Sequence, residues 1–163
     1  MISIIVAISQ ENAIGKNGQL LCHLPSDLQH FKQITSGKTV VMGERTFFSL
    51  PKHPLPNRKN IVLTDVPNKT FEGAQSVYSI EEIVDLFSKT DEEIFIIGGG
   101  MVYRQMMPYA DKLYITHIHH SWQDADTFFP EIDSNIWTLT QNETMPADDK
   151  NPYDYSFAEY IRK

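Results

Sequence analysis

The amino-acid sequence predicts an α/β fold: a single domain built on a central, mostly parallel, twisted sheet of about eight strands with flanking helices. Short apolar runs alternate with helical patterns along the chain, which is typical of strands joined by crossover helices. The length of 163 residues suits one domain, which we expect to span 1–163. The last two strands follow one another with only a polar loop between them, so we expect an antiparallel C-terminal pair.

The first strand and the loop after it are expected near the N-terminus. Residues 2–8 form a continuous apolar run, which favours a buried central strand. Residues 9–23 form a stretch that we expect to be a long loop, and loops of this length are usually functional. Its turn-forming residues are Asn12, Gly15, Asn17 and Gly18.

A helix is expected after this loop. Pro25 suits its first turn and Gly37 its C-terminal cap. Apolar residues recur at helical spacing, and we expect them to form its buried face. They are Leu24, Leu28, Phe31 and Ile34.

The other elements follow from similar patterns. Ser79 and Glu82 form a capping box that opens a helix ending near Ser88, and a helix after Gly100 is expected to stop at Pro108. A short helical turn is expected over 44–50. Strands are expected at 39–43, 60–64, 94–97, 112–119, about 135–143 and about 153–161.

Composition excludes several classes of function. The formal net charge is −7, which disfavours nucleic acid and anionic lipid as partners. No apolar run is long enough to span a bilayer, and the N-terminus has no basic residue before its apolar run, unlike a signal peptide. Cys22 is the single cysteine, which fits a reducing compartment. We expect a cytoplasmic protein with a small-molecule substrate, no membrane association and a monomeric state.

Three strand ends carry small or polar residues: Gly43, Thr64 and Gly98. In open α/β sheets, ligands bind at the carboxyl ends of the strands. The sequence therefore predicts a crevice along that edge of the sheet.

Asp27 is the most informative single residue. It lies three positions after Leu24 and four before Phe31, so it shares the apolar face of the expected helix. Burial there raises the pKa of a carboxyl, whereas the helix N-terminus favours its anion. Asp27 is therefore either a residue of the helix start without a binding role or a buried acid that binds a flat, nitrogen-rich heterocycle.

Two strand-to-helix junctions are candidate phosphate sites. Gly98-Gly99-Gly100 allows close backbone approach beside a helix N-terminus, although position 103 is Tyr103 and the common dinucleotide fingerprint is not met. A tight turn is the alternative. Thr46 either caps its helix or donates to a phosphate.

Arg58 and the histidines also leave alternatives open. Arg58 suits a two-pronged pair with a carboxylate, although most loop arginines are simply solvated. His117, His119 and His120 invite a metal interpretation, but no carboxylate or cysteine joins them at ligand spacing, so we expect no metal site. Cys22 is expected to be a buried thiol and not a nucleophile.

In chain order, these segments resemble bacterial dihydrofolate reductase across nearly the whole sequence. The segments are residues 4–8, Ala13-Ile14-Gly15, Leu24-Pro25-Ser26-Asp27-Leu28 with Phe31-Lys32, Val41-Met42-Gly43 with Arg45-Thr46-Phe47, Leu55-Pro56-Asn57-Arg58, Ile97 with the three glycines, Tyr114-Ile115-Thr116-His117, and Asp126-Thr127-Phe128-Phe129-Pro130. The resemblance implies a reductase that passes a hydride from NADPH to 7,8-dihydrofolate.

The resemblance implies a role for each matching position. Asp27 looks like the ionisable active-site residue that binds the pterin ring and assists protonation of N5, with Thr116 as its hydrogen-bonding neighbour. Arg58 is similar in position to the arginine that grips the glutamate carboxylate of folate. The remaining substrate-binding residues are expected to be Ile5, Val6, Leu28, Phe31, Leu50, Leu55 and Ile97.

The resemblance also implies a cofactor site and a mobile loop. Residues 9–23 resemble the loop that closes over the nicotinamide, and the Gly98–Gly99 bond is cis in the family. The expected cofactor contacts are Ala7, Ile14, Gly15, Leu20, Gly43, Arg45, Thr46, Leu63, Thr64, Gly98, Gly99, Gly100, Met101, Val102, Tyr103 and Thr127.

Three positions depart from the family pattern. Cys22 stands where tryptophan is usual, with Leu21 where proline is usual, so we expect proton delivery and loop closure to be affected but binding to be retained. Glu44 replaces a basic residue after Gly43, where Arg45 is the nearest substitute. Asp65 replaces a small hydroxyl residue near the 2′-phosphate, and Tyr78 stands where lysine can occur. Two carboxylates near that phosphate predict weaker discrimination between NADPH and NADH, with NADH tolerated.

Two other functions remain open. One is a reductase of another pterin or pyrimidine on the same fold, whose substrate would not need Arg58. The other is a pteridine- or nucleotide-binding protein without turnover, in which Cys22 marks lost chemistry.

Overall fold

The central sheet confirms the predicted fold class. The computed structural model describes residues 1–163. It contains an eight-stranded sheet of order β10-β11-β8-β1-β7-β4-β5-β6. Parallel pairs join β1 to β7, β7 to β4, β4 to β5 and β5 to β6, whereas β11 runs antiparallel to β8 and β10.

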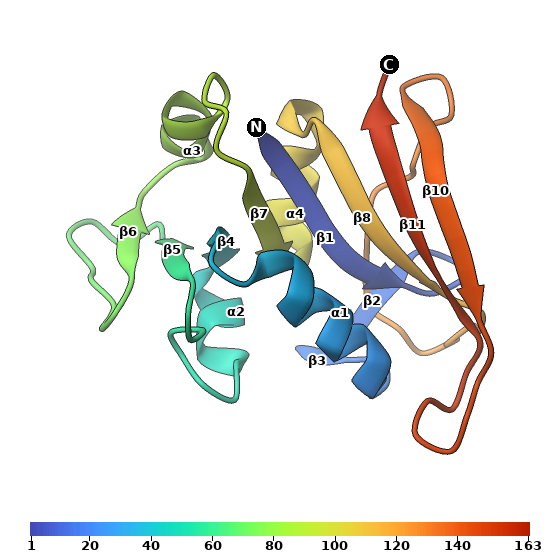
Figure 1. Ribbon diagram of the computed structural model, residues 1–163. Helices are drawn as coiled ribbons and strands as arrows, with labels where there is room; N and C mark the ends of the chain where they lie inside the picture. The colour runs from blue at the N-terminus through green and yellow to red at the C-terminus, as the bar shows by residue number, and fades with distance from the viewer. The chain divides into compact units, whose positions relative to one another are not determined.

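The elements, labelled in Figure 1, are β1 (Ile2–Ile8), β2 (Ala13–Lys16), β3 (Gln19–Leu20), α1 (Pro25–Thr35), β4 (Thr39–Gly43), α2 (Glu44–Ser49), β5 (Lys59–Leu63), β6 (Gln75–Val77), α3 (Ile80–Phe87), β7 (Ile94–Gly98), α4 (Gly100–Met106), the 3-10 helix η1 (Met107–Tyr109), β8 (Lys112–Ile118), β9 (Thr127–Phe128), β10 (Trp137–Met145) and β11 (Tyr155–Arg162).

The chain divides into two compact units. The first comprises Met1–Ile4 and Thr35–Asp111, and the second comprises Ile5–Ile34 and Lys112–Lys163. The expectation of one domain over 1–163 therefore stays a prediction. No helix in the structure is both long and apolar enough to cross a membrane.

The first unit has an apolar core around its parallel strands. Strands β4, β5 and β7 carry fully buried side chains on both faces, as expected of strands covered by helices. Helix α3 begins with the predicted capping box: Ser79 Oγ accepts from the Glu82 N–H at 3.1 Å, and the Glu82 carboxylate accepts from the Tyr78 N–H at 2.8 Å. This cap fixes where the helix begins. The core residues are Val40, Val41, Met42, Ile61, Val62, Ile83, Ile94, Phe95, Ile96, Val102 and Met106.

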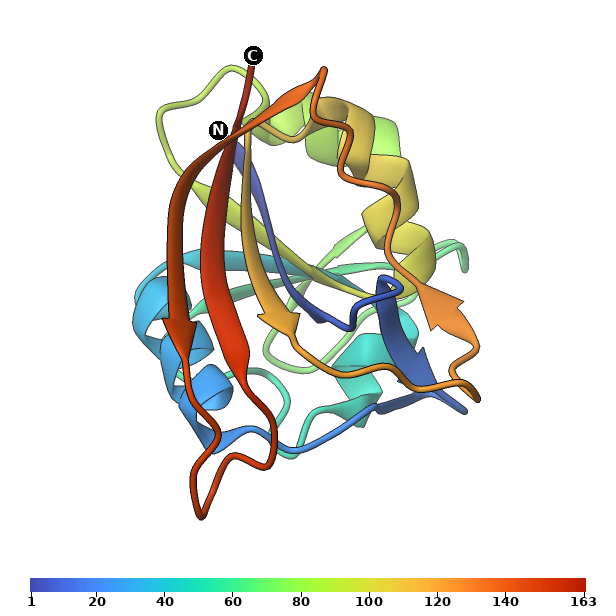
Figure 2. The ribbon, with the colours of Figure 1, turned by 90° about the vertical axis from the view of Figure 1, so that its right-hand side faces the viewer.

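The second unit is an antiparallel arrangement of long strands. In Figure 2, β10 and β11 run side by side, next to β8. Phe157 of β11 pairs with Thr116 of β8 and, on the other side, with Glu143 of β10. Directly opposed residues project from the same face of a sheet. These three side chains therefore form a row across the strands.

Short strands are the elements that the sequence did not reveal. The expected loop 9–23 contains β2 and β3, and β2 also pairs with β9. Strands of two to four residues are too short to show a period of two. The turns themselves are where the sequence placed them, since Asn12, Asn17 and Gly18 have φ of 65°, 51° and 77°. Strand β6 was also not predicted.

The C-terminal strands begin later than expected. Strand β10 starts at Trp137 and not at 135, because the N–H groups of Ile136 and Trp137 both donate to the Asp133 carbonyl. This turn occupies the backbone that a strand would need. Strand β11 likewise starts at Tyr155 and not at 153.

Candidate active site

A partly buried acid lies in the first turn of α1. Asp27 Oδ1 accepts a hydrogen bond from Thr116 Oγ1 of β8 at 2.6 Å. Burial is the largest influence on the Asp27 carboxyl and raises its pKa, while the Thr116 hydrogen bond and the charge of His30 act in the lowering direction. A carboxyl with a raised pKa holds a proton closer to neutral pH than an exposed one does. The two predicted catalytic residues are therefore in direct contact.

The start of α1 is anchored by a residue that the sequence analysis missed. Asn151 Oδ1 accepts from the Ser26 N–H at 3.1 Å, and its Nδ2 donates to Ser26 Oγ at 3.0 Å. Asn151 is 2% exposed, so its amide is committed to holding the residue next to Asp27. No local sequence signal marks an anchor that lies so far along the chain.

Leu28 corrects the predicted buried face of α1. Leu24 is buried as expected, but Leu28 is 47% exposed, and Phe31 and Ile34 are partly buried. Successive helical residues are separated by about 100° around the axis, so Leu28 projects sideways from the position of the partly buried Asp27. An exposed apolar side chain beside a partly buried acid is a feature of ligand pockets.

Glycines bring the backbone of the first unit close to Thr46. A Cβ atom added to Gly98 or Gly99 would lie 3.4 Å or 3.3 Å from Thr46 Oγ1. Gly98 has φ of 133°, which side chains disfavour, and the Gly98–Gly99 bond is cis, as the resemblance implied. A Cβ on Gly43 would lie 3.2 Å from Val102. The strand ends thus form a close-packed junction in which glycine backbone lies beside a hydroxyl.

Arg58 is held in an ordered loop. Its Nη1 donates to Thr35 Oγ1 at 3.0 Å and its Nε donates to the Pro56 carbonyl at 2.9 Å. Asn60 braces the same loop through the N–H and carbonyl of Leu55 and the carbonyl of Arg58. Partial burial lowers the Arg58 pKa. These contacts disfavour the alternative of a simply solvated arginine.

The other expected site residues lie in both units and differ in exposure. In the first unit, Thr64, Val102 and Tyr103 are buried, Leu50, Leu55, Leu63, Ile97 and Gly100 are partly buried, and Arg45 and Met101 are exposed. In the second unit, Ile5, Val6 and Gly15 are buried, Ala7, Ile14 and Thr127 are partly buried, and Leu20 is exposed. Gly15 has a direct reason to lack a side chain, because a Cβ there would lie 2.8 Å from the Gln19 carbonyl oxygen.

Comparison with known proteins decides the family. A sequence model of the family described as dihydrofolate reductase matches residues 1–162. The chain belongs to the dihydrofolate reductase family.

Individual relatives match this chain over nearly their full lengths. The dihydrofolate reductase of Bacillus subtilis (strain 168) is 47% identical over 163 residues, covering 100% of this chain and 95% of the relative. The type 3 enzyme of Salmonella typhimurium is 42% identical over 163 residues, covering 100% and 99%. A solved structure of dihydrofolate reductase from Enterococcus faecalis, complexed with NADP(H) and RAB-propyl, has a TM-score of 0.91 at 39% identity, covering 100% of this chain and 96% of that one.

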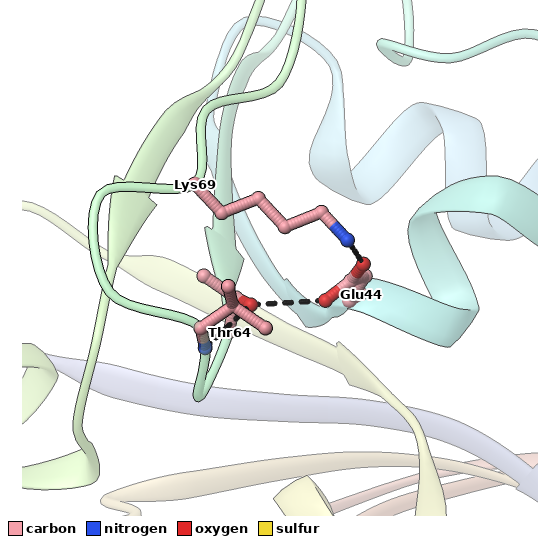
Figure 3. A network of polar contacts seen from close by, with 4 residues as sticks. Glu44, Thr64 and Lys69 are labelled. Carbon is pink, nitrogen blue, oxygen red and sulfur yellow. Dashed lines mark hydrogen bonds and ion pairs between the residues drawn. The ribbon is translucent and has the colours of Figure 1, made fainter.

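Glu44 is one departure from the dihydrofolate reductase pattern, and the structure shows how it is accommodated. Lys69 forms an ion pair with Glu44 Oε1, and Thr64 Oγ1 donates to Glu44 Oε2 at 2.9 Å (Figure 3). Lys69, followed by Thr64, lowers the Glu44 pKa. The Glu44 carboxylate therefore has a lysine partner, while Asp65 is exposed. The expected weaker discrimination between NADPH and NADH stays a prediction. Lys69 was missed because it lies in the loop between β5 and β6, far from Glu44 in sequence.

Cys22 is a second departure from the family pattern. It packs against the buried cluster of Leu24, Ile118 and Tyr155. Burial, and next the charge of Asp27, raise the Cys22 pKa to about 11. The side chain is therefore a thiol at neutral pH, and a thiol is a poor nucleophile and a weak hydrogen-bond donor.

The histidines of β8 contact neighbouring hydroxyl groups. The Nε2 of His117 lies 2.8 Å from the Tyr160 hydroxyl, and the Nε2 of His119 lies 2.9 Å from Ser156 Oγ. No group of three or more His, Cys, Asp and Glu residues is placed to hold a metal ion.

Proposed function

We propose that this chain transfers a hydride from NADPH to 7,8-dihydrofolate to give 5,6,7,8-tetrahydrofolate, and so supports one-carbon metabolism. The observation that carries the proposal is the partly buried Asp27 carboxyl, which accepts a hydrogen bond from Thr116 at 2.6 Å. A flat heterocycle with adjacent ring and amino nitrogens can donate two hydrogen bonds to such a carboxylate. Family membership supports the same reaction.

The substrate site is proposed from the residues already placed. Asp27 and Thr116 bind the pterin ring, and Arg58 binds the glutamate carboxylate, since a guanidinium pairs with a carboxylate through two parallel hydrogen bonds. Apolar side chains cover the rest of the substrate: Ile5, Val6, Leu28, Phe31, Leu50, Leu55 and Ile97.

The residues of the first unit fit a dinucleotide cofactor. Backbone that a Cβ would crowd, at Gly98 and Gly99, lies beside the Thr46 hydroxyl, which is the combination that phosphate groups need. We propose that these residues, with Gly43 and Gly100, hold the cofactor phosphates. The other proposed contacts are Ala7, Ile14, Gly15, Leu20, Arg45, Leu63, Thr64, Met101, Val102, Tyr103 and Thr127.

The proposed mechanism assigns the proton to Asp27. NADPH supplies the hydride when it is bound. Apolar side chains exclude water from the reacting carbons, and residues 9–23 close over the site. Burial raises the Asp27 pKa, so this carboxyl takes up a proton at higher pH than an exposed one does, and it assists protonation of N5. Turnover is therefore expected to fall as pH rises through the Asp27 pKa.

The cofactor preference is proposed to be mixed, with NADPH favoured and NADH tolerated. Glu44 is a carboxylate where the family usually has a base, which disfavours a 2′-phosphate. Lys69 pairs with this carboxylate, so the repulsion is smaller than that of a free one. The ion pair thus supports moderate discrimination between the two cofactors.

We propose further that the chain is a cytoplasmic monomer that acts as one domain over 1–163 and does not bind nucleic acid. The net charge of −7 supports the last point. Sedimentation would report a single species of about the chain mass of 18.7 kDa. A species of twice that mass would contradict the monomer.

The deciding experiment is the loss of NADPH absorbance on addition of dihydrofolate, with NADH measured in parallel. Rapid loss that stops with an antifolate would establish the reaction. Protein that is folded and binds folate and cofactor, but shows no loss with either cofactor, would instead point to a binding protein and to Cys22 as the site of lost chemistry.

A further inference from the structure

His30 stacks on the sheet beside the catalytic acid. Its ring lies on α1, and the centroid is 3.9 Å from that of Phe157 of β11, with 14° between the ring planes. In Figure 2, α1 (blue) lies behind β10 and β11 (orange to red). His30 follows Asp27 by three residues, a spacing that places two side chains on one face of a helix.

The sheet side of this contact is aligned with the Asp27 contact. Phe157 and Thr116 are directly opposed in the β11–β8 register, so they project side by side from one face. Asp27 meets Thr116 through a hydrogen bond, and His30 meets Phe157 through its ring. These two contacts with neighbouring strands hold α1 against the sheet, in addition to the Asn151 anchor at its start.

The charges around His30 are mostly negative. Asp27 on α1, Glu159 on β11 and Glu143 on β10 each favour the imidazolium, although burial is the largest influence and lowers the His30 pKa. On β8, Lys112 forms an ion pair with Glu159 at 2.8 Å, which offsets part of that negative charge.

We propose that His30 is a positioning residue for Asp27: its stacked ring sets α1 so that the carboxyl meets Thr116, and the ionisation of its imidazole is coupled to that of the carboxyl. The coupling is reciprocal, because an imidazolium that is stabilised by a carboxylate stabilises the carboxylate equally. The catalytic meaning of this pair rests on the proposed function, but the coupling itself does not.

The first test is an NMR titration of the His30 imidazole in the wild type and in Asp27→Asn. The neutral amide removes the negative charge of the ionised Asp27 carboxylate, so we expect the His30 pKa to fall. Glu159→Gln serves as the comparison for a second carboxylate. Superimposable His30 titrations in the wild type and Asp27→Asn would overturn the coupling, even if the protein showed no turnover.

The second test separates the ring from the charge. His30→Ala removes both, and we expect kcat to fall by about 10-fold with little change in KM, because Asp27 loses its alignment. His30→Phe keeps an aromatic stack on Phe157, so it should restore most of kcat while the acid of the pH profile titrates at higher pH. Gln33→Ala, at an exposed position of the same helix, is the matched control.

The outcomes are distinct. His30→Ala with unaltered kcat, or His30→Phe that fails to restore it, would overturn the positioning role. If His30→Ala does not fold, the comparison of His30→Phe with the wild type and the imidazole titration decide the matter. A wild-type protein without turnover would instead count against the proposed function.

Discussion

Asp27 experiences opposing influences from its surroundings. Removal from water raises the pKa of the carboxyl, and the Thr116 hydroxyl and the His30 charge counteract part of that effect. Such opposition adjusts an acid toward the pH at which it works. The Thr116 hydroxyl, 2.6 Å away, therefore both orients the carboxyl and lowers its proton affinity.

Asp27→Asn is expected to retain the fold and lose most turnover near neutral pH. The amide keeps the shape and can still accept from Thr116, but it carries no acidic proton. General acid catalysis typically contributes about 10²-fold to 10⁴-fold, so steady-state kcat should fall by at least about 10²-fold. Circular dichroism would verify the fold. Full activity in this variant would refute the role assigned to Asp27.

Lys69 is expected to set the cofactor preference through Glu44. Lys69→Met leaves the Glu44 carboxylate without its ion-pair partner, so the ratio of KM for NADPH to KM for NADH should rise by about 10-fold. Glu44→Gln should lower the same ratio. Steady-state kinetics with both cofactors would measure it, with Lys89→Met, at an exposed lysine elsewhere in the unit, as the control. An unchanged ratio in both variants, or an undiminished large preference for NADPH in the wild type, would contradict this account.

At the scale of single elements, the capping-box residues of α3 stabilise the start of the helix. The Ser79 hydroxyl accepts from the Glu82 N–H, and the Glu82 side chain reaches back to the Tyr78 N–H. Both donors would otherwise lack a partner at the helix start. The element begins where it does because these two bonds are available there.

Ser79→Ala is expected to lower the free energy of unfolding by ~1 kcal/mol, the usual contribution of a helix cap. Ser79→Asp should retain most of it, since aspartate is also a good cap. Urea denaturation would measure both variants. Equal midpoints for Ser79→Ala and the wild type would show that the cap contributes nothing here, and kcat should be the same in all three.

Elements with a long hydrophobic signal or a cap were predictable from the sequence. Strands β1, β4, β5, β7 and β8 lie where apolar runs placed them. The short strands β2, β3, β6 and β9, of two to four residues, were not predictable. Their pairing depends on partners distant in the sequence and not on their own residue pattern. The start of β10 was missed because a turn at Asp133 competes with the strand.

The candidate site was predictable where the type of a single residue indicates the chemistry. It was not predictable where a residue's contact partner is distant in the sequence. Asp27 and the glycines at 98–100 are visible in the sequence, and the contact of Asp27 with Thr116 followed from the resemblance. Lys69, Asn151 and the stacking of His30 on Phe157 were not visible, because each depends on which strands and loops meet in space. Leu28 was misplaced for a related reason: helical spacing marks an apolar face without showing what covers it.

At the scale of the whole molecule, the buried acid makes stability depend on pH. The folded pKa of Asp27 lies above its ordinary value of 3.8. Its contribution to stability is therefore fully present below about pH 3.8 and is lost as pH rises through the folded pKa. Above its folded pKa, the ionised carboxyl destabilises the folded state.

Asp27→Asn is accordingly expected to be more stable than the wild type at pH 8, with a higher midpoint of thermal unfolding. The difference should shrink as pH falls and disappear below about pH 3.8. Calorimetry across this range would measure it. A variant that is less stable than the wild type at pH 8 would show that Asp27 is not destabilised by burial.

The two ends of the sheet order have a consequence for self-association. One end is β6, with only three residues. The other is β10, whose register with β11 is interrupted by a bulge between Leu139 and Gln141 and whose middle residues are exposed and polar. Short, bulged and charged edges are poor templates for a further strand. Concentrated protein therefore has no smooth edge on which fibrils could grow by strand addition, and a variant that straightened β10 with apolar residues would create one.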